Sequence, residues 1–252
     1  MLAGMYDDRV RDEALHLLRN GQTLSQASRT LGISRAALRD WRSGTPRRIR
    51  RQGCPRCGEA ALSGESYAAL LGYYLGDGCI SAAARYFALR VSCDVSYPRI
   101  IQDVEEQIHR IRPGANVWRV SAPGVVVVQS NWKHWPCLFP QHGPGRKHER
   151  PIVLEAWQRS LVEQFPADFL RGLLHSDGSR VANWATRKVG GVLKRYDYPR
   201  WKFTNHSADI RALCCWALDL LDIPWRQSNW KTISVSRRKA VARLDDLVGL
   251  KC

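Results

Sequence analysis

The stretches LLGYYLGDG (residues 70–78) and LRGLLHSDG (residues 170–178) are an internal repeat of one apolar pattern. Each carries a glycine five positions before an aspartate, a small residue directly before that aspartate and a glycine directly after it. The apolar spacing predicts two helices. Glycine inside a helix costs about 1 kcal/mol relative to alanine, so Gly72 and Gly172 need a structural reason. Close backbone contact between the two helices is the simplest reason.

The aspartates of the repeat, Asp77 and Asp177, meet at one place if the two helices pack side by side with their C-terminal ends aligned. Two carboxylates at helix ends that are themselves negative repel each other unless a cation joins them. Mg²⁺ prefers oxygen ligands, and ions of this kind support phosphodiester hydrolysis. The repeat therefore predicts a site for Mg²⁺ or Mn²⁺. The alternative is that each Asp-Gly only ends its helix.

The residues after each motif predict a repeated order of strand, capped helix, strand and helix. In the first half the expected elements are a strand at 85–91, a helix capped by Ser96, and a hairpin of 117–121 and 125–130 turned at Pro123-Gly124. In the second half they are a strand at 200–205, a helix capped by Ser207, a strand at 232–236 and a helix ending near Val248.

The two nonapeptides resemble those of the LAGLIDADG homing endonucleases, and the chain is similar to single-chain members with two motifs. The resemblance covers about residues 60–252. It implies an α+β core with a pseudo-twofold axis, built of two αββαββα halves at 61–155 and 156–252, each with a saddle-shaped sheet laid over DNA. It also implies that Asp77 and Asp177 are the metal-binding catalytic acids.

Two positions depart from the family pattern, because Leu75 and His175 stand where many members have Asp. These positions precede the catalytic acids, so the departure does not by itself predict inactivity. Family members also place a basic residue near each acid, often between the last strand of a half and its closing helix. The resemblance therefore implies Lys147 in the first half and Lys239 in the second, polarising the attacking water or stabilising charge on the phosphate.

The N-terminal residues 1–45 predict a small all-α helix-turn-helix domain. A first helix is expected at 7–19, a second at 23–31, a turn at Gly32 and a third at 35–41 after the N-cap Ser34. The small Ala27 permits a close crossing of the second and third helices. Candidate DNA contacts on the third helix are Ser34, Arg35 and Arg39. Three-helix patterns with no DNA role are the alternative.

Residues 46–60 are predicted to be a basic linker that carries a Cys-x-x-Cys knuckle. Its candidate phosphate contacts are Arg47, Arg48, Arg50 and Arg51, and a solvated tether is the alternative. Cys54 and Cys57 supply half of a tetrahedral zinc site, whereas the alternative is two free thiols in a tight turn. The aromatic-rich segment 132–142 contains two histidines, His134 and His142, which we interpret as packing residues rather than zinc ligands or catalytic groups.

The charge balance predicts a nucleic-acid partner, because 39 Lys and Arg against 23 Asp and Glu leave a formal charge of +16. Candidate DNA contacts on the predicted strands are Arg90, Arg187, Lys188, Lys194, Arg200 and Lys202. Eight cysteines without a disulfide-like spacing indicate reduced thiols. No apolar run approaches the length of about 20 residues that spans a bilayer, and no signal peptide is visible. We therefore expect a cytoplasmic, nucleoid-associated monomer without a membrane partner.

These patterns together predict a site-specific endonuclease that hydrolyses double-stranded DNA with a divalent metal. A transcription regulator is the alternative, because some bacterial regulators join a LAGLIDADG-like core to a helix-turn-helix and tend to lose the catalytic acids. Retention of Asp77 and Asp177 favours the enzyme, whereas the helix-turn-helix favours the regulator. An RNA splicing maturase is a third possibility that the charge does not distinguish.

Overall fold

The computed structural model describes residues 8–43, 53–58 and 60–251, and it divides the chain into two compact units. The division falls between residues 51 and 52. The predicted linker contacts Arg47, Arg48, Arg50 and Arg51 lie outside the described residues. No helix in the described part of the chain is long and apolar enough to cross a membrane.

The first unit has the predicted helix-turn-helix order of α1 (Asp8–Arg19), α2 (Leu24–Leu31) and α3 (Arg35–Arg42). Gly32 ends α2 at φ +66°, in the left-handed region that favours glycine. Ser34 Oγ accepts a hydrogen bond from the Ala37 amide at 3.2 Å, so Ser34 is the N-cap of α3 as expected. The small core of the unit consists of Ala14, Ala27, Ile33 and Leu38. Ala27 is fully buried, as a close crossing of helices requires.

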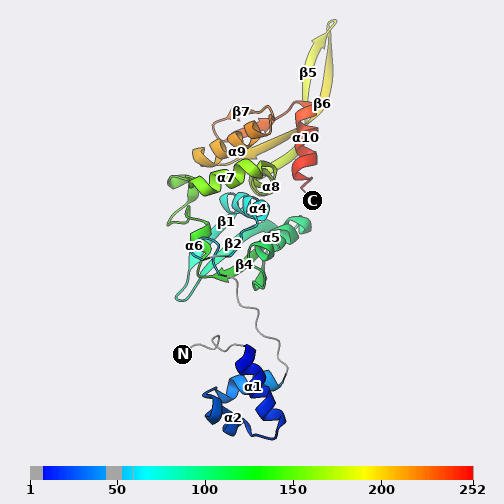
Figure 1. Cartoon of the computed structure of the whole chain (residues 1–252). Coiled ribbons are helices and arrows are strands. Elements are labelled where there is room, and N and C mark those ends of the chain that lie inside the picture. The colour runs from blue at the N-terminus through cyan, green and yellow to red at the C-terminus, as the bar shows by residue number, and fades with distance from the viewer. Residues whose placement is uncertain (1–7, 44–52, 59, 252) are drawn as a thin grey trace. The chain divides into compact units, whose positions relative to one another are not determined.

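The second unit consists of two halves with the same order of elements (Figure 1). The first half contains α4 (Gly64–Leu75), β1 (Gly78–Ala82), β2 (Phe87–Asp94), α5 (Pro98–Ile111), β3 (Val117–Ala122), β4 (Val125–Trp132) and α6 (Trp135–Leu138). The second half contains α8 (Pro166–Asp177), β5 (Gly178–Val189), β6 (Val192–Thr204), α9 (Ala208–Leu220), β7 (Arg226–Asn229), β8 (Thr232–Val235) and α10 (Arg238–Val248). A 3₁₀ turn, η1 (Lys147–Glu149), and α7 (Ala156–Gln164) connect them.

Each half forms a four-stranded antiparallel sheet of the same topology, β1-β2-β4-β3 in the first and β5-β6-β8-β7 in the second. The predicted α+β class with two αββαββα halves is confirmed. Ser207 caps α9 as expected, since its side chain accepts from the Ile210 amide. Ser96 does not cap α5, because Pro98 begins the helix and makes Tyr97 the N-cap residue. A proline has no amide N–H to be capped and is preorganised for the first helical turn.

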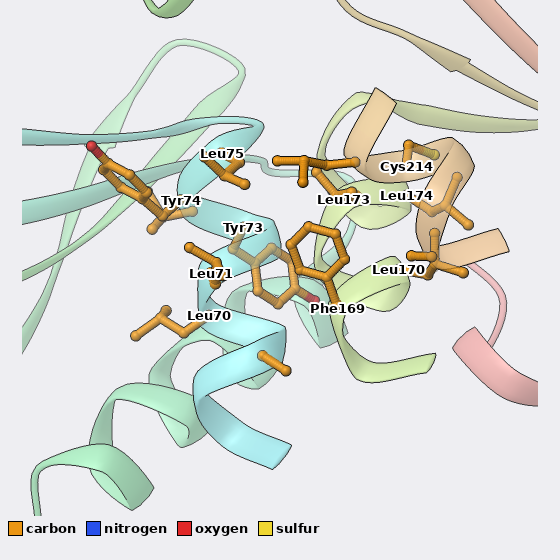
Figure 2. Packing of buried hydrophobic residues seen from close by; sticks show 14 of the residues in the cluster. Leu70, Leu71, Tyr73, Tyr74, Leu75, Phe169, Leu170, Leu173, Leu174 and Cys214 are labelled. Carbon is orange, nitrogen blue, oxygen red and sulfur yellow. The ribbon is translucent and has the colours of Figure 1, made fainter. Parts of the chain in front are cut away.

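The halves are joined by the packing of α4 against α8 at the two motif glycines. A Cβ built on Gly72 would lie 2.3 Å from the Phe169 carbonyl oxygen, and one built on Gly172 would lie 2.2 Å from the Ala69 carbonyl oxygen. Either distance is shorter than any real Cβ contact, so only glycine fits at both positions. Figure 2 shows the apolar side chains of both helices gathered around this crossing, including Tyr73. The sequence-based explanation of the glycines is therefore confirmed.

Replacing Gly72 with alanine is expected to destabilise the second unit. The added methyl meets backbone atoms, which cannot move aside as a flexible side chain can, so the helices must separate. Overpacking of this kind costs about 1–3 kcal/mol, which exceeds the gain of about 0.5–1 kcal/mol from helix propensity. Urea unfolding of the full chain measures the change in the free energy of unfolding.

The matched control is Gly53→Ala, because Gly53 is exposed and a Cβ there meets nothing within 4 Å. This control should stay within about 0.5 kcal/mol of the parent. Equal stabilities of the two variants would contradict the close crossing.

Candidate active site

The two motif helices end side by side, which brings Asp77 and Asp177 to one site. Asp77 follows the C-cap Gly76 of α4, and Asp177 is the last residue of α8. A Cβ built on Gly76 would lie 2.3 Å from the Ser176 Cβ and 3.4 Å from Asp177 Oδ2. Because the chain directly before Asp77 touches the residue before Asp177 and the Asp177 carboxylate itself, the predicted meeting of the two helix ends is present.

The carboxylates are held in a setting that disfavours their charge. Partial burial and repulsion by Asp177 raise the pKa of Asp77 to about 6, against the attraction of Lys147 and Lys251. Asp77 nevertheless keeps one side open to solvent. Burial also raises the pKa of Asp177, and a hydrogen bond from Asn205 Nδ2 to Asp177 Oδ2 at 2.6 Å opposes this shift. A cation at this place would relieve the repulsion.

Lys147 lies at the C-terminal end of α4, as the resemblance implied for a lysine near the first acid. Its ammonium donates to the carbonyl oxygens of Tyr74 at 2.6 Å, Gly76 at 2.5 Å and Gly78 at 2.9 Å. These carbonyls lie at the negative end of the helix dipole, where a cation is stabilising. Burial lowers the pKa of Lys147 to about 8, and the two aspartates oppose that shift. The side chain therefore still carries its proton at neutral pH.

Lys251 occupies the equivalent position in the second half and is not among the residues predicted from the sequence. Its ammonium donates to the carbonyl oxygens of Ser176 at 3.0 Å and Gly178 at 3.2 Å, at the C-terminal end of α8. Lys239, the predicted counterpart, is exposed in the first turn of α10, and its role near the second acid stays a prediction. The sequence feature that points to Lys251 is a lysine after the closing helix of each half, since Lys147 follows α6 and Lys251 follows α10.

The carboxylate site opens into a cleft of about 580 Å³ with Asp177 in its wall. Basic and imidazole side chains line much of the cleft: His142, Arg146, Lys147, His148, Arg150 and His206. Arg146 and His148 are exposed, so their side chains are available to a ligand. Arg150 instead holds the loop in place, donating to the backbone oxygens of Gln141, Pro144 and Gly145. An anion would therefore meet positive charge beside the paired aspartates.

The predicted DNA contacts on the strands do not all lie on the same face of their sheet. In sheet register Arg90 is paired with Cys79 and Gln129, on the face opposite the buried Leu89 and Val91. In the β5–β6 hairpin, Arg187 pairs with Lys194. Since side chains alternate along a strand, the positions of one face of the hairpin include Arg187, Lys194, Arg200 and Lys202. Lys188 pairs with Leu193 and so belongs to the other face.

The third helix of the first unit presents its predicted side chains to solvent. Ser34, Arg35 and Arg39 are all exposed, whereas Leu38 is fully buried in the core of the unit. A nucleic acid could reach these three side chains.

The cysteines of the predicted knuckle have partners that the sequence did not suggest. Cys57 Sγ lies 3.1 Å from His134 Nδ1, and Cys137 lies in the same cluster with Cys54. His134 does contact the Trp132 ring, as the packing interpretation expected, but its Nδ1 faces sulfur. The distance along the chain hid this cluster, because the two pairs belong to segments far apart in the sequence.

No protein-family model and no curated protein matches the sequence. Among solved structures, the LAGLIDADG meganuclease I-AabMI bound to uncleaved DNA has a TM-score of 0.46 at 12% identity, over 72% of this chain and 82% of its own. I-DmoI in complex with DNA and Ca has 0.44 at 11%, over 73% and 89%. Full-length DUF199/WhiA from Thermatoga maritima has 0.43 at 13%, over 74% and 56%. These likenesses concern the fold alone, so membership of the LAGLIDADG family stays a prediction.

The donor atoms at the motif ends fit Mg²⁺ or Mn²⁺. Asp77 and Asp177 offer carboxylate oxygens, which are the hard ligands that Mg²⁺ prefers. Burial raises the pKa of both acids, and repulsion by Asp177 adds to the shift at Asp77, so the charged forms are not fully compensated. Lys147 and Lys251 direct their ammonium groups at backbone carbonyls, so an ion bound by the carboxylates would supply the missing positive charge.

Replacing Asp77 with asparagine is expected to stabilise the metal-free protein at pH 7–8. The pKa of Asp77 is raised from 3.8 to about 6, so the folded state binds this proton more tightly than the unfolded chain does. Ionisation above pH 6 therefore costs stability, and that cost disappears as the pH falls through 6 towards 4. The advantage of Asp77→Asn should shrink over the same range.

Thermal unfolding in a chelator, followed from pH 4 to pH 8, measures this difference. Added Ca²⁺ should raise the Tm of the parent more than that of the variant, because the variant has lost one charged ligand. An advantage of the variant that does not change with pH would contradict the raised pKa of Asp77.

Proposed function

We propose that the second unit is a metal-dependent endonuclease of the LAGLIDADG type that cleaves double-stranded DNA at a specific site. The observation that carries the proposal is the pair of aspartates at two touching helix ends, each end bound by its own lysine. Simple helix termination requires neither the pairing nor the second lysine. A phosphodiester substrate accounts for both, since it needs a metal site with positive charge around it.

Asp77 and Asp177 would hold the divalent metal in this proposal. When bound, Mg²⁺ or Mn²⁺ supplies charge stabilisation to the scissile phosphate. Asn205 orients the Asp177 carboxylate through its hydrogen bond to Oδ2, which leaves the other oxygen for the ion. The amide fixes one rotamer of the acid before the substrate arrives.

Lys147 and Lys251 have two roles in the proposed mechanism. Each ammonium satisfies backbone carbonyls that would otherwise be unpaired at a helix end, and so holds the aspartate next to it in place. Each also brings a positive charge close to the carboxylates and to a phosphate bound between them. The second role requires protonation, which the pKa of about 8 for Lys147 allows at neutral pH.

The DNA would lie across the open faces of the two sheets, with the cleft at the scissile phosphates. Arg90 belongs to this face in the first half, and Arg200 and Lys202 belong to it in the second. The β5–β6 hairpin extends away from the helices (Figure 1), which would carry Arg187 and Lys194 along the duplex. A formal charge of +16 supports binding to a polyanion.

A DNA-binding transcription regulator is the second candidate function, and the first unit favours it. The exposed Ser34, Arg35 and Arg39 belong to α3 and its N-cap. In the helix-turn-helix of α2 and α3, α3 is the second helix, and this is the helix that enters the major groove in proteins of this kind. In that case the unit would select the operator, and the paired aspartates would be retained for packing.

Cleavage of a randomised library of double-stranded DNA with Mg²⁺, followed by sequencing of new ends, tests the enzyme and supplies its site. On that site Asp177→Asn is expected to reduce the rate by orders of magnitude, because the metal site loses a charged ligand. Lys251→Met should also reduce the rate, since it removes the cation at the end of α8. The matched control is Lys239→Met, whose side chain is exposed on α10.

Binding to the same DNA in Ca²⁺ should persist in Asp177→Asn, which separates chemistry from recognition. Parent protein that binds a site tightly but produces no ends with Mg²⁺ or Mn²⁺ would overturn the endonuclease and leave the regulator. A Lys239→Met variant as slow as Lys251→Met would overturn the assignment of Lys251.

A further inference from the structure

Four side chains with metal-ligating atoms gather away from the paired aspartates. Cys54 and Cys57 belong to the segment CPRCG (residues 54–58), and His134 and Cys137 lie where β4 leads into α6. Their ligand atoms all lie within 4.8 Å of one another. Cys57 Sγ lies 3.1 Å and Cys137 Sγ lies 3.7 Å from His134 Nδ1. Among the described residues this is the one group of three or more such side chains placed to share an ion.

The distances match a tetrahedral zinc site. Zinc lies about 2.3 Å from sulfur and about 2.0–2.1 Å from imidazole nitrogen, so the ligand atoms of a tetrahedron are about 3.5–3.8 Å apart. The sulfur-to-nitrogen distances of 3.1 and 3.7 Å lie close to that range. Three cysteines and one histidine form a soft ligand set that suits zinc and leaves no position open for a substrate.

The first ligand pair has the backbone of a zinc-binding turn. The amide of Arg56 donates to Cys54 Sγ at 3.4 Å, an interaction that stabilises a negative sulfur. A Cβ built on Gly58 would lie 3.1 Å from the Cys54 carbonyl oxygen, so the chain closes tightly after Cys57. The guanidinium of Arg56 lies 4.4 Å from the centre of the Trp157 ring, which secures the turn against the body of the unit.

The second ligand pair is equally well placed. His134 precedes α6 as its N-cap residue, and the Cys137 amide donates to the His134 carbonyl oxygen at 3.0 Å. Two residues separate His134 from Cys137, as two residues separate Cys54 from Cys57, so the side chains of His134 and Cys137 lie on one side of the turn. Trp132 packs edge-on against the His134 ring, with centroids 5.1 Å apart, which fixes the orientation of the imidazole.

We propose that Cys54, Cys57, His134 and Cys137 bind one structural zinc ion. The ion joins the turn at 54–58 to the β4–α6 corner, and so fixes the place where the chain from the first unit enters the second. A site with four protein ligands has no direct part in hydrolysis. The inference is therefore independent of the proposed nuclease and holds for a regulator as well.

The full chain, purified without added chelator, is expected to contain about one zinc per molecule by inductively coupled plasma mass spectrometry. Cys57→Ser should lower the zinc content at least about tenfold after dialysis against a mild chelator, because the site loses a charged ligand. The matched control is Cys79→Ser, since Cys79 is also an exposed free thiol but lies outside the cluster. It should keep the zinc content of the parent.

A second measurement on the parent chain covers the case in which Cys57→Ser does not fold. Co²⁺ added after removal of zinc should give the intense thiolate-to-metal absorption and visible bands of a tetrahedral site with three sulfurs. Amides at 53–58 and 133–139 should exchange faster without metal, while those of α4 and α8 stay protected. A parent chain without zinc and without Co²⁺ bands overturns the proposal, as does a Cys54–Cys57 disulfide in protein purified under reducing conditions.

Discussion

The crossing of α4 and α8 at Gly72 and Gly172 is the constraint on which the second unit depends. No side chain separates the two backbones there, since a Cβ on either glycine would overlap a carbonyl of the other helix. The helices continue from this point by only one turn, so their C-terminal ends remain in contact at Gly76 and Ser176. The same contact therefore joins the two hydrophobic halves and sets the separation of the acids that follow.

The electrostatic problem at the helix ends follows from that packing. Two helix termini and two carboxylates concentrate negative charge at one place, and cations at a helix C-terminus stabilise by about 0.3–1 kcal/mol each at exposed sites. Lys147 and Lys251 supply such cations from the connections after α6 and α10. The two lysines do not fully compensate the cost of charging Asp77, because the pKa of Asp77 remains raised to about 6. The remaining imbalance is what makes the site suited to a divalent cation.

The sequence was sufficient for features that depend on local pattern and repetition. Gly72 and Gly172 could be explained from the sequence, because a glycine present at the same position in two copies of an apolar helix is best explained by close contact between the two helix backbones. Lys251 could not be found in the same way, since α6 has four residues and α10 has eleven, and the copies lose their alignment between them. The pairing of Cys57 with His134 was hidden for a related reason, because it depends on how a loop packs against a distant corner. Tertiary contacts of this kind leave no periodic signal.

The two halves share a topology but give their aspartates different surroundings. In register, Gly78 pairs with Val91 and Gly178 pairs with Phe203, so the residues two positions further on, Cys93 and Asn205, correspond. Asn205 donates a hydrogen bond to Asp177 and favours its charged form. Cys93 offers a thiol whose pKa is raised to about 12 by burial and by Asp77, so it stays neutral.

Asp77 thus lacks the compensation that Asp177 has from its own sheet. Burial and Asp177 raise the pKa of Asp77 to about 6, whereas the hydrogen bond from Asn205 opposes the effect of burial on Asp177. A symmetric fold therefore builds an asymmetric site, in which Asp177 is oriented by Asn205 from its own sheet and would offer a cation a preplaced carboxylate oxygen. Above its pKa of about 6 Asp77 is charged as well, so at neutral pH a divalent cation would offset the repulsion between the two carboxylates.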